Sequence, residues 1–171
     1  MKLSRLSFFV WLATTILFVA SVGGSIFALP ARVAIHFDAS GDANGWISRE
    51  SHTAGFIALG LGLSAFLLGI AYIIRFFPAS TLNVPRQAYW RAPENYPRAC
   101  AFFFTHTFWL AALSNLFMSV LNLGIVVANS AAAPASLVGN LSIATGLFAT
   151  GLLVWCLFLF RFFLKAPRPT P

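Results

Sequence analysis

Charged side chains are scarce in this sequence of 171 residues, of which Asp, Glu, Lys and Arg make up 9% and hydrophobic residues 59%. Soluble domains usually contain about 25% charged and about 45–50% apolar residues. This small number of ionised groups cannot cover a surface that faces water. Most of the apolar side chains must therefore face lipid. The composition therefore excludes an ordinary soluble domain, and the length predicts one membrane domain over residues 1–171.

Groups of residues that carry chemistry are also missing. The two cysteines, Cys100 and Cys156, lack the spacing of metal ligands and predict neither a zinc site nor a disulfide framework. We expect both thiols to be buried as small hydrophobic groups. No nucleophile–base set or phosphate-binding loop is visible, so we expect no enzymatic activity and no cofactor. The net charge is +7, but no dense basic run supports nucleic-acid binding.

Long apolar segments are what the sequence does contain. About 20 apolar residues are needed for a helix to cross the hydrocarbon core of a bilayer. Four segments qualify, at about residues 8–29, 53–77, 99–128 and 137–164. Their interiors carry no ionised residue, each of which would cost about 2.5–3.5 kcal/mol at the bilayer centre. The pattern predicts an all-α membrane protein, a bundle of four transmembrane helices in the lipid bilayer.

The basic residues at the ends of these segments predict the orientation. Only Arg32 and Arg49 fall in the loop after the first helix, and Asp38, Asp42 and Glu50 accompany them there. Cytoplasmic flanks collect Lys and Arg, so both termini and loop 78–98 should be cytoplasmic, and loop 30–51 external. A bacterial inner membrane is the expected location. The other cations are Lys2, Arg5, Arg75, Arg86, Arg91, Arg98, Arg161, Lys165 and Arg168.

A cleaved signal peptide is an alternative reading of the first helix. Lys2 and Arg5 precede its apolar run, and small residues near Ala20 and Gly24 would permit cleavage. The apolar core of a signal peptide is about 7–15 residues, which is shorter than this run. We therefore expect the first helix to be retained.

Small residues recur four apart in three of the predicted helices. Such stripes let helices approach closely in lipid. We expect them to pack within the bundle, with a homo-oligomer or contact with other membrane subunits as the alternative. The stripes are Ala20, Gly24 and Ala28; Ala54, Ala58 and Gly62; and Ser142, Gly146 and Thr150.

A polar stripe marks the third helix. Asn115, Ser119, Asn122 and Asn129 lie within an arc of about 80° at 100° per residue. Because unpaired amides are costly in lipid, the stripe should face the bundle interior. It either supplies hydrogen bonds between helices or lines a small polar cavity. His106 lies off the stripe, and we expect it at the membrane interface.

The external loop is the first candidate binding region. Pro30 ends the first helix, residues 32–37 could form a short extended piece, and the following Asp, Ser, Gly and Asn residues favour a turn. A calcium loop is excluded because Ala43 and Arg49 replace the required Gly and Glu. The loop is either a recognition surface for a peptide ligand or partner, or a turn that caps the bundle. A metal held by His36, Asp38 and Asp42 is the weakest of the three alternatives, so we expect no metal. The candidate residues are His36, Phe37, Asp38, Gly41, Asp42 and Trp46.

The loop over residues 78–98 is the second candidate region. Its prolines prevent a long helix, and it mixes aromatic with basic residues. That mixture suits lipid headgroups, and docking of a soluble regulator is the alternative. The candidate docking residues are Asn83, Pro85, Tyr89, Trp90, Arg91 and Glu94.

Both loops carry motifs that resemble one family. The pattern LP-x5-HF-x3-G-x3-GW begins at Leu29, and N-x-P-x3-YW-x2-PE begins at Asn83. The chain thereby resembles the uncharacterised bacterial membrane domain found in SdpI-type immunity proteins. The resemblance implies immunity to a secreted peptide toxin, or signalling of its presence by holding a repressor at the membrane. Alternatives from the residues alone are an accessory subunit of a membrane complex, and a small transporter or channel built on the asparagine stripe.

The predicted orientation can be tested with single cysteines in a background in which Cys100 and Cys156 are replaced by serine. We expect Asp42→Cys to react with an impermeant maleimide in intact cells, and Glu94→Cys to react only after permeabilisation. Labelling of Glu94→Cys in intact cells would contradict the orientation.

Overall fold

Four long helices dominate the computed structural model, which describes residues 2–38, 42–130 and 137–165, and the side chains of these except at 2–4 and 137–141. They are α1 (Lys2–Ser25), α2 (Arg49–Ile73), α4 (Tyr96–Ala128) and α5 (Leu137–Leu164). Each contains a span long and apolar enough to cross a membrane. The predicted fold class, an all-α membrane protein with four transmembrane helices, is confirmed.

Short elements occupy the two ends of the bundle. Strands β1 (Arg32–Phe37) and β2 (Ala43–Ser48) form an antiparallel hairpin between α1 and α2. The short 3-10 turns η1 (Ile74–Phe76) and η2 (Ala79–Thr81) and the single-turn helix α3 (Gln87–Trp90) lie between α2 and α4. The extended piece expected at residues 32–37 is confirmed. Its partner β2 was not predicted, because the Asn and Gly in β2 are poor strand formers.

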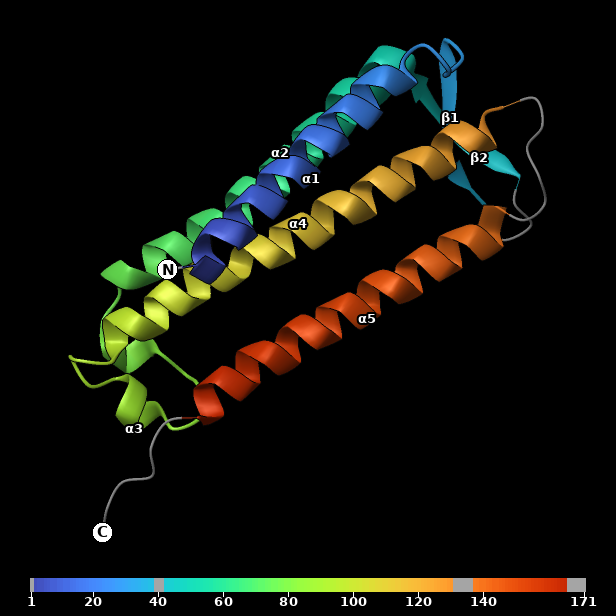
Figure 1. Ribbon diagram of the computed structural model, residues 1–171. Coiled ribbons are helices and arrows are strands. Elements are labelled where there is room, and N and C mark those ends of the chain that lie inside the picture. The colour runs from blue at the N-terminus through green and yellow to red at the C-terminus, as the bar shows by residue number, and fades with distance from the viewer. Residues whose placement is uncertain (1, 39–41, 131–136, 166–171) are drawn as a thin grey trace.

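The longest helix, α4, is the centre of the arrangement. It packs against α1 and α2 on one side and against α5 on the other. In Figure 1, α4 lies between the α1–α2 pair and α5, and the hairpin and α3 lie at opposite ends. The start of α1 and the end of α5 lie at the α3 end. Three segments that the basic residues assign to one side of the membrane therefore share one end of the bundle.

Helix ends differ from the apolar segments that predicted them. Helix α1 begins at Lys2, α2 at Arg49 and α4 at Tyr96. At the start of α2 the hydroxyl of Ser48 accepts the Ser51 N–H at 3.0 Å, which satisfies one of the free donors of the first turn. These three helices thus begin three to six residues before the predicted segments, whereas α1 and α2 end at Ser25 and Ile73, four residues before the predicted ends at 29 and 77.

The three stripes of small residues lie on the outer faces of the described bundle, and the prediction that they pack inside it was wrong. A Cβ added at Gly24, Gly62 or Gly146 would meet no atom within 4 Å. Gly60, outside these stripes, is buried between helices, and a Cβ there would lie 2.3 Å from the ring of Phe18. A large ring fitting onto a glycine, and not the four-residue repeat, selects the contact face of α2.

The thiols also differ in placement. Cys100 is buried, as expected, whereas Cys156 is exposed on α5 and contradicts the expectation. The reason is that α5 packs chiefly on one neighbour, α4, so much of its circumference remains outside the bundle.

The ring of Phe18 makes Gly60 and Gly62, two of the four glycines of α2, a matched pair for mutation. We expect Gly60→Ala to destabilise the protein by about 1–3 kcal/mol, the usual cost of overpacking a filled site. Gly62→Ala has the same effect on helix propensity but meets open space, so it should be neutral or stabilising. Equilibrium unfolding in a mixed-detergent titration measures both. Equal effects would contradict the Phe18 contact.

Candidate functional site

Helix α4 presents three asparagines at intervals of seven residues, Asn115, Asn122 and Asn129, on one helical face. The first two are 1% and 2% exposed, so the stripe faces the interior as expected. The third stands at the C-cap of α4, beside the hairpin. Each side-chain amide binds a different part of the chain.

Asn115 and its hydrogen-bond partners, which we call the Asn115 layer, join three helices. Ser64 on α2 donates its hydroxyl to Asn115 Oδ1 at 3.0 Å, and Asn115 Nδ2 donates to Thr15 Oγ1 on α1 at 2.8 Å. Thr15 in turn donates to the carbonyl of Trp11 at 2.7 Å. Ser119 also donates its hydroxyl within α4, to the Asn115 carbonyl at 2.9 Å. This chain of hydrogen bonds supports the interpretation of the stripe as an interhelical connection.

The Asn122 layer contains a residue that the sequence analysis missed. His52 on α2 is 2% exposed, and its Nε2 lies 3.0 Å from Asn122 Oδ1. An amide oxygen only accepts, so His52 donates from Nε2. Asn122 Nδ2 reaches the Ser21 carbonyl on α1 at 3.5 Å. A single histidine in an apolar helix has no periodic signature, so only the packing of α2 on α4 identifies His52.

Asn129 connects α4 to the hairpin. Its Oδ1 accepts the N–H of Ala34 at 2.8 Å, and its Nδ2 donates to the carbonyl of Ala34 at 2.9 Å. One side-chain amide thus pairs with both main-chain groups of a β1 residue, as a neighbouring strand would. Val33 next to it is fully buried. The hairpin is therefore fixed to the end of α4.

The hairpin carries most of the predicted external residues. His36 is exposed, and its Nδ1 contacts the Asn44 amide oxygen. Gly45 lies opposite, where a Cβ would come within 2.9 Å of the His36 Cβ, so this close approach requires glycine. Trp46 is 45% exposed, with the guanidinium of Arg32 5.3 Å from its ring centre.

The turn of the hairpin is held by the two aspartates. The N–H of Asp38 donates to the Asp42 carbonyl at 2.9 Å, and the N–H of Asp42 donates to Asp38 Oδ1 at 3.0 Å. Phe37 is half-buried, and Gly41 lies outside the described residues. Across the described parts of the chain, no three His, Cys, Asp or Glu side chains gather in a group that could hold a metal ion.

The candidate residues of loop 78–98 divide into those that pack against the bundle and those that are exposed. Trp90 is 2% exposed and donates from Nε1 to the Phe163 carbonyl of α5 at 2.9 Å, so its ring is not a free docking surface. Arg91 donates to the Leu82 carbonyl at 2.9 Å. This loop is therefore folded onto the ends of α4 and α5. Tyr89 and Pro85 are half-buried, and Asn83 and Glu94 remain exposed.

His106 lies between helices. Its Nε2 donates to the Trp155 carbonyl at 3.0 Å, and Trp155 Nε1 donates to the His106 carbonyl at 3.0 Å. The two rings stack with centres 5.0 Å apart. The expectation of an interfacial residue overlooked this role, because the contact depends on α5, which begins about 30 residues later in the sequence. His106 fixes α5 to α4.

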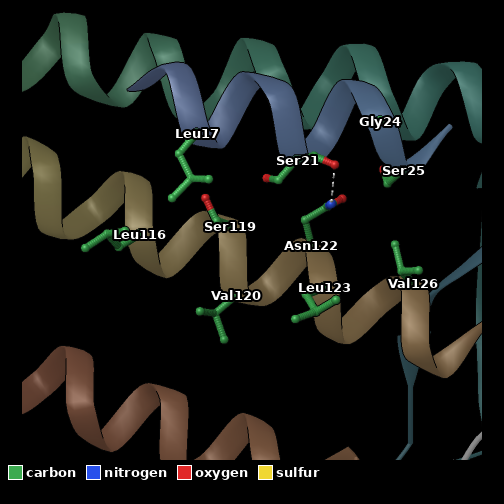
Figure 2. Close-up of a pocket in the computed structure, with 10 residues that line it drawn as sticks. All are labelled: Leu17, Ser21, Gly24, Ser25, Leu116, Ser119, Val120, Asn122, Leu123 and Val126. Carbon is green, nitrogen blue, oxygen red and sulfur yellow. Dashed lines mark hydrogen bonds between the residues drawn. The ribbon is translucent and has the colours of Figure 1, made fainter. Parts of the chain in front are cut away.

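An apolar groove with a volume of about 670 Å³ lies between α1 and α4 on the bundle surface. Figure 2 shows Asn122 reaching toward Ser21 at its floor, with Ser119 beside it. Asn115 does not line this groove, so the two buried amides do not share it. The other lining residues are Leu17, Gly24, Ser25, Leu116, Val120, Leu123 and Val126.

The Asn115 layer can be tested with a double-mutant cycle. We expect Asn115→Ala and Ser64→Ala to couple by about 0.6 kcal/mol and at most about 1.7 kcal/mol, the range for hydrogen bonds between membrane helices. As a control, Asn115→Ala and His52→Ala belong to different layers and should be additive. Unfolding in mixed detergent measures the four states, and zero coupling between Asn115 and Ser64 would contradict the bond.

Comparison with known proteins finds a family match for one segment of the chain. Residues 9–61 match a family described as a domain of unknown function, DUF1648. The segment covers most of α1, the whole hairpin and the first half of α2, and it includes Pro30, His36 and Trp46. No curated protein and no solved structure matches. The chain is thus a multi-pass membrane-type helical protein that contains an uncharacterised domain.

Proposed function

We propose that the protein is a non-enzymatic sensor or immunity protein of the SdpI type, placed in the bacterial inner membrane. In this proposal the hairpin faces outward and receives a secreted peptide, and both termini and loop 78–98 are cytoplasmic. The distribution of Lys and Arg supports the orientation. The start of α1, the short helix α3 and the end of α5 also lie at one end of the bundle, which agrees with this orientation.

The observation that carries the proposal is the pairing of Asn129 with Ala34. Two hydrogen bonds, of 2.8 and 2.9 Å, join the main chain of β1 to the end of α4. A ligand that displaces the hairpin must break these bonds or move α4 with them. The hairpin and the helix are therefore mechanically linked, which a loop that only capped the bundle would not require.

Helix α4 could carry such a displacement to the other side. It is one continuous helix of 33 residues, held to α1 and α2 by the Asn115 and Asn122 layers. At its far end the Tyr96 hydroxyl lies 2.8 and 2.9 Å from the carbonyls of Ile74 and Phe77, and its one proton is shared between them. A shift of α4 would thus reach the loop that displays Asn83 and Glu94, where a soluble regulator would dock.

An accessory subunit of a larger membrane complex is the second candidate. The exposed stripes that include Gly24, Gly62 and Gly146 favour it, since they leave three outer faces open to close approach by other helices. Purification in a mild detergent separates the two functions. Stoichiometric companion subunits would support the second candidate, whereas the first requires none.

The proposed link predicts a specific loss of function for Asn129→Leu. In a gene-deletion strain challenged with culture supernatants, the wild-type chain should restore survival or the transcriptional response, and Asn129→Leu should abolish it. The variant should still be inserted, because it leaves the apolar spans unchanged. Ser130→Ala is the matched control, since among the described residues the Ser130 hydroxyl bonds to the Val127 carbonyl of α4 and not to the hairpin. A response that survives Asn129→Leu would contradict the coupling, and a deletion strain with unchanged survival and transcription would contradict the function.

A further inference from the structure

The two edges of the hairpin differ, and the difference follows from its register. In an antiparallel pair, residues opposite each other alternate between positions that exchange hydrogen bonds and positions whose N–H and C=O point away from each other. Ala34 directs both groups away from β2, toward Asn129. Its partner in the register is Trp46. The N–H and C=O of Trp46 therefore point out of the hairpin on the β2 side.

A second hydrogen bond confirms this alternation of inward-pointing and outward-pointing residues. The N–H of Arg49 donates to the Ala31 carbonyl at 3.1 Å, one residue beyond the Arg32–Ser48 pair. Bonded positions are thus Ala31–Arg49 and Val33–Ile47, and outward positions are Arg32–Ser48 and Ala34–Trp46. The side chain of Asn129 closes the β1 edge at Ala34. In the described parts of the chain no group closes the β2 edge at Trp46.

Proteins usually cover, charge or distort a free strand edge, because it is a template for another strand. Here the Asn129 side chain covers one edge, and none of the residues that the structure describes covers the other. The side chain at the open position is the 45% exposed ring of Trp46, which can pack against a neighbouring strand. Arg32 lies over that ring without an acidic partner within ion-pair distance among the described residues, so the same face is positively charged.

We propose that β2 is a docking edge for an extended peptide, which pairs by its main chain with the N–H and C=O of Trp46 as the third strand of the sheet. Strand addition of this kind obtains affinity from main-chain bonds and selectivity from alternate side chains. The inference rests on the proposed function for the origin of the peptide, but its geometry concerns the hairpin alone. The positive face favours a peptide with an acidic side chain near the pairing residue.

The test uses the full chain in nanodiscs of phosphatidylethanolamine and phosphatidylglycerol. Without peptide, the Trp46 amide should exchange its hydrogen much faster than the Ile47 amide, which points into the hairpin. Peptides are then selected from a random decapeptide library without proline. A selected peptide should slow exchange at Trp46 at least tenfold. Slow exchange at Trp46 in peptide-free nanodiscs would overturn the proposal, because lipid or protein would already cover the edge.

Two variants separate the main chain of Trp46 from its ring. Trp46→Val and Trp46→Pro both remove the ring, but only Trp46→Pro removes the outward N–H, and proline is tolerated in an edge strand at such a position. We expect Trp46→Pro to bind a selected peptide about three- to tenfold more weakly than Trp46→Val, the effect of one main-chain hydrogen bond. Protection of the Ile47 amide shows that the hairpin of each variant remains folded.

Modified peptides provide a readout that does not depend on those variants. N-methylation along a selected peptide should weaken binding at alternate residues only, because every second N–H of a strand faces its neighbour. Uniform tolerance of N-methylation, or a library without binders, would overturn the proposal. The cellular challenge is independent of this result. Peptide binding at the β2 edge without a cellular response would contradict the proposed function only. A cellular response without slower hydrogen exchange at Trp46 would contradict the docking edge only.

Discussion

The requirement that every polar group find a partner inside the bilayer determines the centre of this fold. Hydrocarbon offers no hydrogen bonds, so a side-chain amide within a transmembrane helix is stable only where another part of the chain satisfies it. Helix α4 carries two such amides. Ser64 and Thr15 satisfy Asn115, and His52 and the Ser21 carbonyl satisfy Asn122. These needs fix the rotation of α1 and α2 around α4.

The same chemistry continues beyond the helical core. Asn129 uses its amide in the way that Asn115 and Asn122 do, but its partner is the main chain of Ala34. A seven-residue repeat along one helix thus connects two helices and one strand. It makes the hairpin an extension of the bundle, and it closes one hairpin edge, while none of the described residues closes the other edge at Trp46. Both the proposed coupling and the proposed docking edge depend on this third asparagine.

Helix α5 is held by a different interaction. Aromatic stacking and reciprocal side-chain bonds between His106 and Trp155 attach it to α4, and Trp90 adds a bond to its end at Phe163. These contacts lie on one side of α5 only. The outer sides of α1, α2 and α5 carry the small-residue stripes, and these faces can therefore meet lipid or the helices of another subunit.

The sequence by itself determined the fold class, the approximate spans and the inward direction of the asparagine stripe. These follow from local properties: apolar length, absence of charge and the angle per residue of a helix. Tertiary structure alone decided which glycine is buried, because the choice between Gly60 and Gly62 depends on the Phe18 ring of another helix. It also decided that His52 joins Asn122, that Trp90 is part of the core, and that β2 pairs with β1. Each of these depends on a partner distant in the chain or on a strand with weak propensity, so no local pattern encodes it.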